Sequence, residues 1–80
     1  MRIDKVVEFI HRQPFQPFDI HMSDGRVYTV DHPDFVSYSR DGSTVSFWTA
    51  EDQRLVLLDS HHITGLAIAN RPPISAAPNQ

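Results

Sequence analysis

The sequence predicts a mainly β protein of the α+β class, in which an N-terminal helix precedes a five-stranded antiparallel meander that closes into a small barrel. Three observations predict this class. Apolar residues first recur with the 3.6-residue period of a helix, and from Phe18 onward the period is two. Asp24-Gly25 and Asp41-Gly42 then separate alternating segments, as hairpin turns do. A meander with alternating faces can curl into a barrel, which removes its exposed edges.

A single helix is expected over residues 3–13. Its apolar side chains fall on one stripe, at Ile3, Val6, Val7 and Ile10. Pro14 ends the helix because its ring disfavours helical geometry in the preceding residue. A helix of this length is too short to persist alone, so its stripe must pack on a sheet.

The first two strands, about 18–23 and 26–39, are expected to form a hairpin. A three-residue loop, 23–25, with Gly25 in the left-handed conformation sets apolar side chains opposite one another. A two-residue loop would set apolar side chains opposite polar ones, so we expect the longer loop. The pairs that follow are Ile20 with Tyr28 and Phe18 with Val30.

The second strand is expected to bend at His32-Pro33, because Pro33 cannot donate a hydrogen bond to a ladder. A third strand, about 44–50, follows the second turn. A two-residue loop at Asp41-Gly42 gives the pairs Tyr38 with Val45 and Val36 with Phe47.

The last two strands are expected at about 54–59 and 64–69, with a short helical turn between them. Residues 55–58 form an unbroken apolar run and are apolar on both faces, so we expect them in the most central strand. The chain is therefore interpreted as one domain, 1–69, followed by a disordered tail, 70–80, rich in Pro and small polar residues.

Composition excludes several classes of function. With 80 residues and no Cys, the domain has a thin core and neither disulfides nor thiolate metal ligands. Lys and Arg number 7 against 10 Asp and Glu, which disfavours broad contact with nucleic acid because such contact requires cations at phosphates. The first residues hold no long apolar run, so we expect no signal peptide, no membrane span and a cytoplasmic location.

Two segments carry a resemblance to a known family. "FDIHMSDGRVYTV" is similar to the first hairpin of Sm-like proteins, and "DSHHITGLAI" is similar to the Y-K-H-x-I-S stretch of their bacterial host-factor branch. The order of elements over about residues 3–69 also resembles the small SH3-type barrel of these proteins. The resemblance implies binding of single-stranded RNA, with His61 on the family's histidine, Ile63 on its isoleucine and Ser60 in place of its lysine.

A second resemblance is more specific. The chain is similar to a set of short, uncharacterised bacterial proteins that share the pattern P-F-x-P-F-x-I-x-x-x-D-G-R followed by H-P-x-F. This resemblance transfers no catalytic residue. The matching positions are Pro14, Phe15, Pro17, Phe18, Ile20, Asp24, Gly25, Arg26, His32, Pro33 and Phe35.

Histidine and aspartate supply the candidate metal ligands, namely His21, His32, His61, His62, Asp31 and Asp34. No H-x-x-x-H or H-E-x-x-H spacing occurs, and the adjacent His61 and His62 cannot both face one ion in an extended segment. No G-x-S-x-G motif or Gly-rich phosphate loop occurs either. We therefore expect no metal, no cofactor and no catalytic residue, and we expect His32 to hydrogen-bond the backbone at its bend.

Aromatic side chains remain as candidates for a surface site. If Phe47 points into the core, Trp48 points outward, and an outward Trp on a small domain is often an interface anchor. The rings of Phe15 and Phe18 either cover the core beneath the helix or form an exposed ledge for a partner. Covering the core is the preferred interpretation because such rings bury a large apolar area.

Two functions are consistent with the sequence. The first is a non-catalytic interaction module that self-associates or docks an unknown protein, with Trp48, Phe15 and Phe18 as its candidate contacts. The alternative is Sm-like binding of single-stranded RNA, which the acidic charge disfavours. The candidate contacts of the alternative are His61, Arg54 and Tyr38, together with Trp48.

Overall fold

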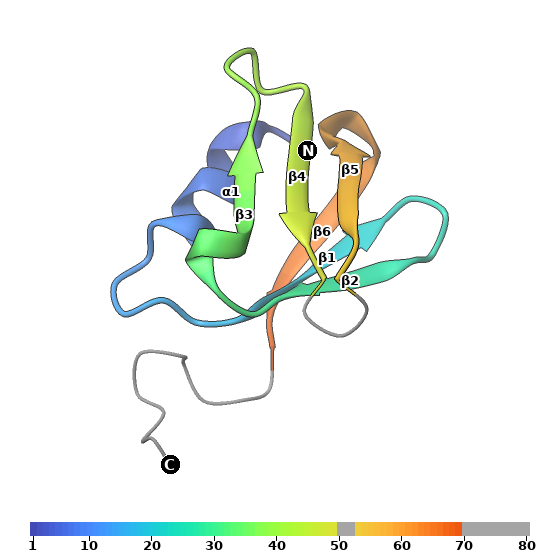
Figure 1. The fold of residues 1–80 in the computed structure, drawn as a ribbon. Helices are drawn as coiled ribbons and strands as arrows, with labels where there is room; N and C mark the ends of the chain where they lie inside the picture. The colour runs from blue at the N-terminus through green and yellow to red at the C-terminus, as the bar shows by residue number, and fades with distance from the viewer. Residues whose placement is uncertain (50–52, 70–80) are drawn as a thin grey trace.

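The computed structural model describes residues 1–49 and 53–69 of the chain. These residues form one α-helix, six strands and two short 3₁₀ helices (Figure 1). In chain order the elements are α1 (Ile3–Ile10), β1 (Phe18–Met22), β2 (Val27–Val30), η1 (Pro33–Phe35), β3 (Val36–Tyr38), β4 (Thr44–Trp48), β5 (Leu55–Asp59), η2 (Ser60–His62) and β6 (Ile63–Ile68).

The strands of the described residues form two three-stranded antiparallel sheets, in the orders β2-β1-β6 and β3-β4-β5. The predicted mainly β class with an N-terminal helix is therefore confirmed. The strand expected over 26–39 is divided into β2 and β3 by η1, so five predicted strands become six. Pro33 begins η1, where its fixed φ suits a helical turn and its missing N–H is not needed. The strand pairing seen in the described residues does not close a barrel, and barrel closure stays a prediction.

The helix α1 is shorter than the predicted span of 3–13, because it ends at Ile10. Its last hydrogen bond runs from the N–H of His11 to the carbonyl oxygen of Val7 at 3.0 Å. Pro14 has no N–H to offer the carbonyl of Ile10, and it disfavours helical geometry in the residue before it. The effect of Pro14 therefore reaches further back than the sequence prediction allowed.

The first hairpin has the predicted three-residue loop. The N–H of Met22 donates to the carbonyl oxygen of Arg26 at 2.9 Å, which leaves residues 23–25 as the loop. Gly25 has a φ of 91°, the left-handed conformation that favours glycine. The predicted pairs of Ile20 with Tyr28 and of Phe18 with Val30 are confirmed.

The second hairpin has the predicted register, with Val36 opposite Phe47 and Tyr38 opposite Val45. Its loop is wider than the two residues predicted. The N–H of Ser39 donates to the carbonyl oxygen of Thr44 at 2.9 Å, and the N–H of Gly42 donates to the carbonyl oxygen of Ser39 at 3.0 Å. The turn therefore spans residues 40–43, which preserves the parity of the flanking strands and so their inner face.

Asp41 holds this second turn together. Its Oδ1 accepts hydrogen bonds from the backbone N–H of Ser43 at 3.0 Å and from the hydroxyls of Ser43 and Ser39 at 2.8 Å. These bonds, above all the one from the backbone of Ser43, lower the pKa of the Asp41 carboxyl to about 2. The carboxylate is the form that the turn binds.

The prediction that residues 55–58 occupy the most central strand is wrong. In the part of the chain that the structure describes, β5 is the last strand of its sheet and pairs with β4 alone. Leu58 is buried and Val56 is half-buried, whereas Leu55 and Leu57 are exposed. A continuous apolar run does not distinguish a strand buried on both faces from one whose outer face is open, and this is the source of the error.

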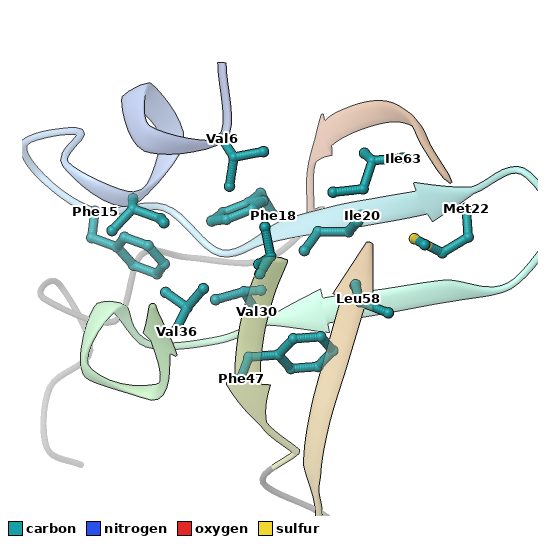
Figure 2. Packing of buried hydrophobic residues seen from close by; sticks show 12 residues of the cluster. Val6, Phe15, Phe18, Ile20, Met22, Val30, Val36, Phe47, Leu58 and Ile63 are labelled. Atoms are coloured by element: carbon teal, nitrogen blue, oxygen red, sulfur yellow. The ribbon is translucent and has the colours of Figure 1, made fainter. Parts of the chain in front are cut away.

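One hydrophobic core joins α1 to both sheets (Figure 2). Phe9 and Phe15 both pack edge-on against Phe18, with ring centroids 5.3 and 6.1 Å from its own. The helix stripe therefore packs on the sheets, as its short length requires. The buried members of the core are Val6, Ile10, Phe15, Phe18, Ile20, Met22, Val30, Val36, Val45, Phe47, Leu58 and Ile63.

Some sequence predictions fall outside the described residues. The expected tail, 70–80, lies there, as does residue 50, the expected end of the third strand; β4 ends at Trp48. The last strand, β6, ends at Ile68, one residue short of its predicted end. Within the described ranges, no helix has the length and apolar character needed to cross a membrane.

Candidate interaction surface

An apolar patch lies on the outer face of the β4–β5 ladder. Trp48 is opposite Leu55 and Ser46 is opposite Leu57, and these positions alternate with the buried Phe47. The exposed fractions are 51% for Trp48, 55% for Leu55 and 65% for Leu57. Single exposed apolar side chains are common, but three neighbours on one sheet face form a surface suited to a partner. We name Trp48, Leu55 and Leu57 the outer apolar patch.

The outward direction of Trp48 was predicted and is confirmed, because Phe47 beside it is 1% exposed. A pocket of about 290 Å³ adjoins the Trp48 side chain and is lined also by Phe35, Thr49 and Gln53. The ring of Phe35 is 41% exposed and lies 5.3 Å from the ring of His32, centroid to centroid. The patch therefore continues from β4 toward η1 as a recess between two aromatic side chains.

The rest of the outer face of this sheet is polar. The hydroxyls of Ser37 and Ser46 lie 2.7 Å apart across β3 and β4, and Thr44 is opposite Asp59 at the other end of β5. An apolar centre with hydroxyls and a carboxylate beside it has the anatomy of a protein interface and its rim.

Phe15 and Phe18 are not part of this surface. Both rings are buried in the core and contact each other edge-on. The segment "PFQPF" therefore covers the core, as the preferred interpretation had it, and the two rings do not form the exposed ledge considered as the alternative. Their burial removes large apolar area from water, which decides between the two placements.

Asp59 and two histidines meet at η2. Asp59 Oδ1 accepts from the backbone N–H of His61 at 2.9 Å and lies 3.0 Å from His61 Nδ1. Nε2 of His62 lies 4.0 Å from Asp59 Oδ2. The backbone hydrogen bond from His61, and then that from its side chain, lower the pKa of the Asp59 carboxyl. Asp59 is the N-cap of η2, so this cluster shapes the turn into β6.

The other candidate ligands are dispersed. His32 caps η1, because its Nδ1 accepts from the N–H of Asp34 at 3.1 Å, which confirms the predicted backbone contact at the bend. His21 is opposite Val27 in the other sheet. Over residues 1–49 and 53–69, no group of three or more His, Cys, Asp or Glu side chains could hold a metal ion.

The residues of the nucleic-acid alternative do not converge on one site. Arg54 precedes β5 and His61 follows it, so roughly 17 Å of strand separates them. Tyr38 pairs with Val45, three residues along β4 from Trp48. The candidate contacts are therefore spread over both ends of the sheet.

Leu55, Leu57 and Phe35 were not recognised as surface residues from the sequence. A signal existed for the leucines, since an outward Trp48 with a short turn after it sets Leu55 on the same face. The apolar character of the whole run hid that signal. For Phe35 the motif H-P-x-F gives no face, because η1 interrupts the alternation on which face assignments rest.

Comparison of the chain with protein-family models, with curated proteins and with solved structures gave no significant match. The two resemblances found in the sequence therefore stay predictions.

Proposed function

We propose that the chain is a non-catalytic, cytoplasmic interaction module that acts by binding protein, in the first instance further copies of itself, through the outer apolar patch. The observation that carries the proposal is the exposure of Trp48, Leu55 and Leu57 by more than half on a single sheet face. Covering such side chains yields about 25 cal/mol for each Å² of apolar area removed from water. Trp is also over-represented among the residues that dominate interface energies.

The size of the chain favours self-association over an isolated existence. A chain of 80 residues without Cys has only a thin core to stabilise it, and small domains gain stability from burial shared between copies. A second copy brings the same patch, so one contact can be self-complementary. Docking of a different protein on the patch is the second form of the same proposal.

The scaffold that we propose for this module is a small Sm- or SH3-like barrel. β2 and β3 follow each other through η1 and belong to different sheets, so they act as one strand bent at His32-Pro33 that passes between the sheets. The return of β6 to pair with β1, after a 3₁₀ turn, supports the same topology. The outer apolar patch then lies on the outside of the barrel wall.

Sedimentation velocity tests the proposal. The wild type is expected to have a mass above the 9.1 kDa of one chain, and this mass is expected to fall on dilution. Leu55→Glu and Leu57→Glu are expected to be monomers. Val27→Glu is the matched control, because Val27 is 50% exposed on β2 of the other sheet. A wild type that is monomeric at every accessible concentration, or equal effects of the patch and control variants, would contradict the proposal. Far-UV circular dichroism establishes that each variant is folded.

A second candidate function is Sm-like binding of single-stranded RNA. The observation that favours it is the pocket between the exposed rings of Trp48 and Phe35, since bases stack on such rings. The excess of acidic residues opposes it, because phosphate contacts supply much of the affinity for single strands. Self-association is therefore the function that we place first.

A further inference from the structure

We propose that the second copy binds along the free edge of β5 as an antiparallel strand, about a two-fold axis at Val56, with Leu55 of each copy opposite Leu57 of the other. This inference rests on the proposed self-association through the outer apolar patch. It adds to that proposal the strand, the register and the symmetry. The hydrogen-bond directions of β5 and the order of its side chains carry it.

In the part of the chain that the structure describes, the backbone groups at the outer edge of β5 have no partner strand. Two hydrogen bonds of 2.9 Å mark the ends of the β4–β5 ladder, from the N–H of Thr49 to the oxygen of Arg54 and from the N–H of Ser60 to the oxygen of Ser43. Hydrogen-bonded pairs alternate along an antiparallel ladder, so positions 54, 56, 58 and 60 bond to β4. Leu55 and Leu57 direct their N–H and C=O groups away from β4. In the described residues no strand is hydrogen-bonded to that side of β5.

β5 is better suited than the other edges to pair with a further strand. It has five residues in unbroken register with β4, and it contains no Lys, Arg or Pro, the residues that commonly protect an edge. β2 and β3 have four and three residues, and the register of β6 on β1 is irregular. A pocket of about 400 Å³ lies between β5, at Leu57, and the β1–β2 turn.

The order of side chains selects one register. Only residues whose N–H and C=O groups point away from β4 can form hydrogen-bonded pairs with a second copy of β5. The two-fold axis must therefore pass through a residue of β5 and not between two residues. An axis at Leu55 sets Leu57 opposite Gln53, and an axis at Leu57 or Leu58 sets a leucine opposite Asp59. Only the axis at Val56 sets both leucines opposite leucines.

This register joins two patches into one surface. On the outer face of the paired sheets, one row of side chains runs from Trp48 and Leu55 of one copy to Leu57 and Ser46 of the other. The two-fold axis produces a second such row that runs in the opposite direction. Each of the two leucine pairs exchanges two main-chain hydrogen bonds. The two sheets β3-β4-β5 become one sheet of six strands, and the two-fold contact closes with two copies.

Single cysteine substitutions test the register, because the chain has no Cys of its own. Val56 would face itself across the axis as a non-hydrogen-bonded pair, with Cα atoms about 4.5 Å apart, inside the range that a disulfide spans. Val56→Cys treated with oxidised glutathione is therefore expected to form a covalent dimer roughly tenfold faster than Leu55→Cys or Leu57→Cys. The two leucine variants are the matched controls, since each sits one position from the axis.

The outcomes separate the two proposals. A wild-type monomer in sedimentation defeats the proposed self-association and with it this inference. A wild-type oligomer in which Leu57→Cys or Leu55→Cys links faster than Val56→Cys leaves self-association standing and overturns the register. An oligomer in which none of the three links overturns pairing through β5 and favours contact through another edge or face.

A further variant covers the case in which Val56→Cys does not fold, since Val56 is half-buried. Leu55 and Leu57 are exposed, so the double variant Leu55→Cys/Leu57→Cys leaves the core intact. The proposed register sets Cys at 55 opposite Cys at 57 of the second copy, about 5.5 Å apart between Cα atoms. Covalent dimer in the double variant, at roughly tenfold the rate of either single variant, supports the register, and equal rates overturn it.

Discussion

Replacement of Gly42 by Ala is expected to destabilise the domain by separating the β3–β4 turn from α1. A Cβ at Gly42 would lie 2.7 Å from Ile3 Cγ2, closer than real Cβ contacts, and 3.2 Å from Ile3 Cβ, tighter than most of them. Gly42 also has a φ of 76°, and this left-handed conformation costs an L-residue about 1 kcal/mol. Moving Ile3 out of the overlap disturbs the helix packing and costs about 1–2 kcal/mol more. The free energy of unfolding of Gly42→Ala is therefore expected to fall by about 2–3 kcal/mol.

Gly25→Ala is the matched control for this prediction. Gly25 has a φ of 91°, but nothing lies within 4 Å of the Cβ that it would acquire, so only the backbone cost of about 1 kcal/mol remains. Urea unfolding followed by far-UV circular dichroism measures both variants. Ile3→Ala removes the methyl in closest contact and is expected to cost less in the Gly42→Ala background than in the wild type. Equal losses for Gly42→Ala and Gly25→Ala would refute the packing of the turn against α1.

Three further predictions concern the core, the acid stability and the alternative function. Phe18→Ala is expected to lower the free energy of unfolding by about 3–5 kcal/mol because the Phe18 ring is fully buried. Phe35→Ala is expected to lower it by under about 1 kcal/mol because the Phe35 side chain is 41% exposed, and urea unfolding compares the two variants. The pKa of Asp41, about 2, lies below its ordinary 3.8, so its turn stabilises the fold above pH 3.8 and loses this effect as the pH falls toward 2. The stability difference between the wild type and Asp41→Asn is expected to shrink over that interval in an acid titration, and a constant difference would remove Asp41 as the cause. Oligouridine at low salt is expected to leave Trp48 fluorescence unchanged because the net charge is −3, whereas saturable quenching would favour the RNA-binding alternative.

The local parts of the fold could be predicted because short-range rules decide them. Parity alone required a three-residue loop before Arg26, and Gly25 supplied the left-handed residue that such a loop needs. The register of the second hairpin followed from the same argument, although its turn proved wider. The bend at His32-Pro33 was predicted, but the 3₁₀ turn that divides the strand was not. Pro33 indicates that the strand is interrupted and does not indicate which structure the interrupting residues adopt.

The place of a strand in its sheet depends on distant segments, and here prediction failed. The run at 55–58 is apolar on both faces, and β5 is nevertheless the last strand of its sheet among the residues that the structure describes. For the candidate site the same limit applies: Trp48 was found from its alternation with Phe47, whereas Leu55 and Leu57 were placed with the rest of the run in a central strand, without an assignment to the surface. Sequence patterns report which side chains avoid water, and they do not report which neighbour covers them.

The failed prediction and the proposed dimer bear on the same question. β5 was expected to be central because both of its faces are apolar, and in the described residues it has a neighbouring strand at one edge only. Pairing about Val56 would supply a strand at the other edge of β5 and would bring Leu55 and Leu57 of one copy into contact with Leu57 and Leu55 of the other. β5 would then be a central strand, but of a sheet that two copies share. A polar substitution at Leu57 is consequently expected to dissociate the dimer and to leave the monomer folded. The same substitution at the buried Leu58 is expected to unfold the chain, so that no dimer forms.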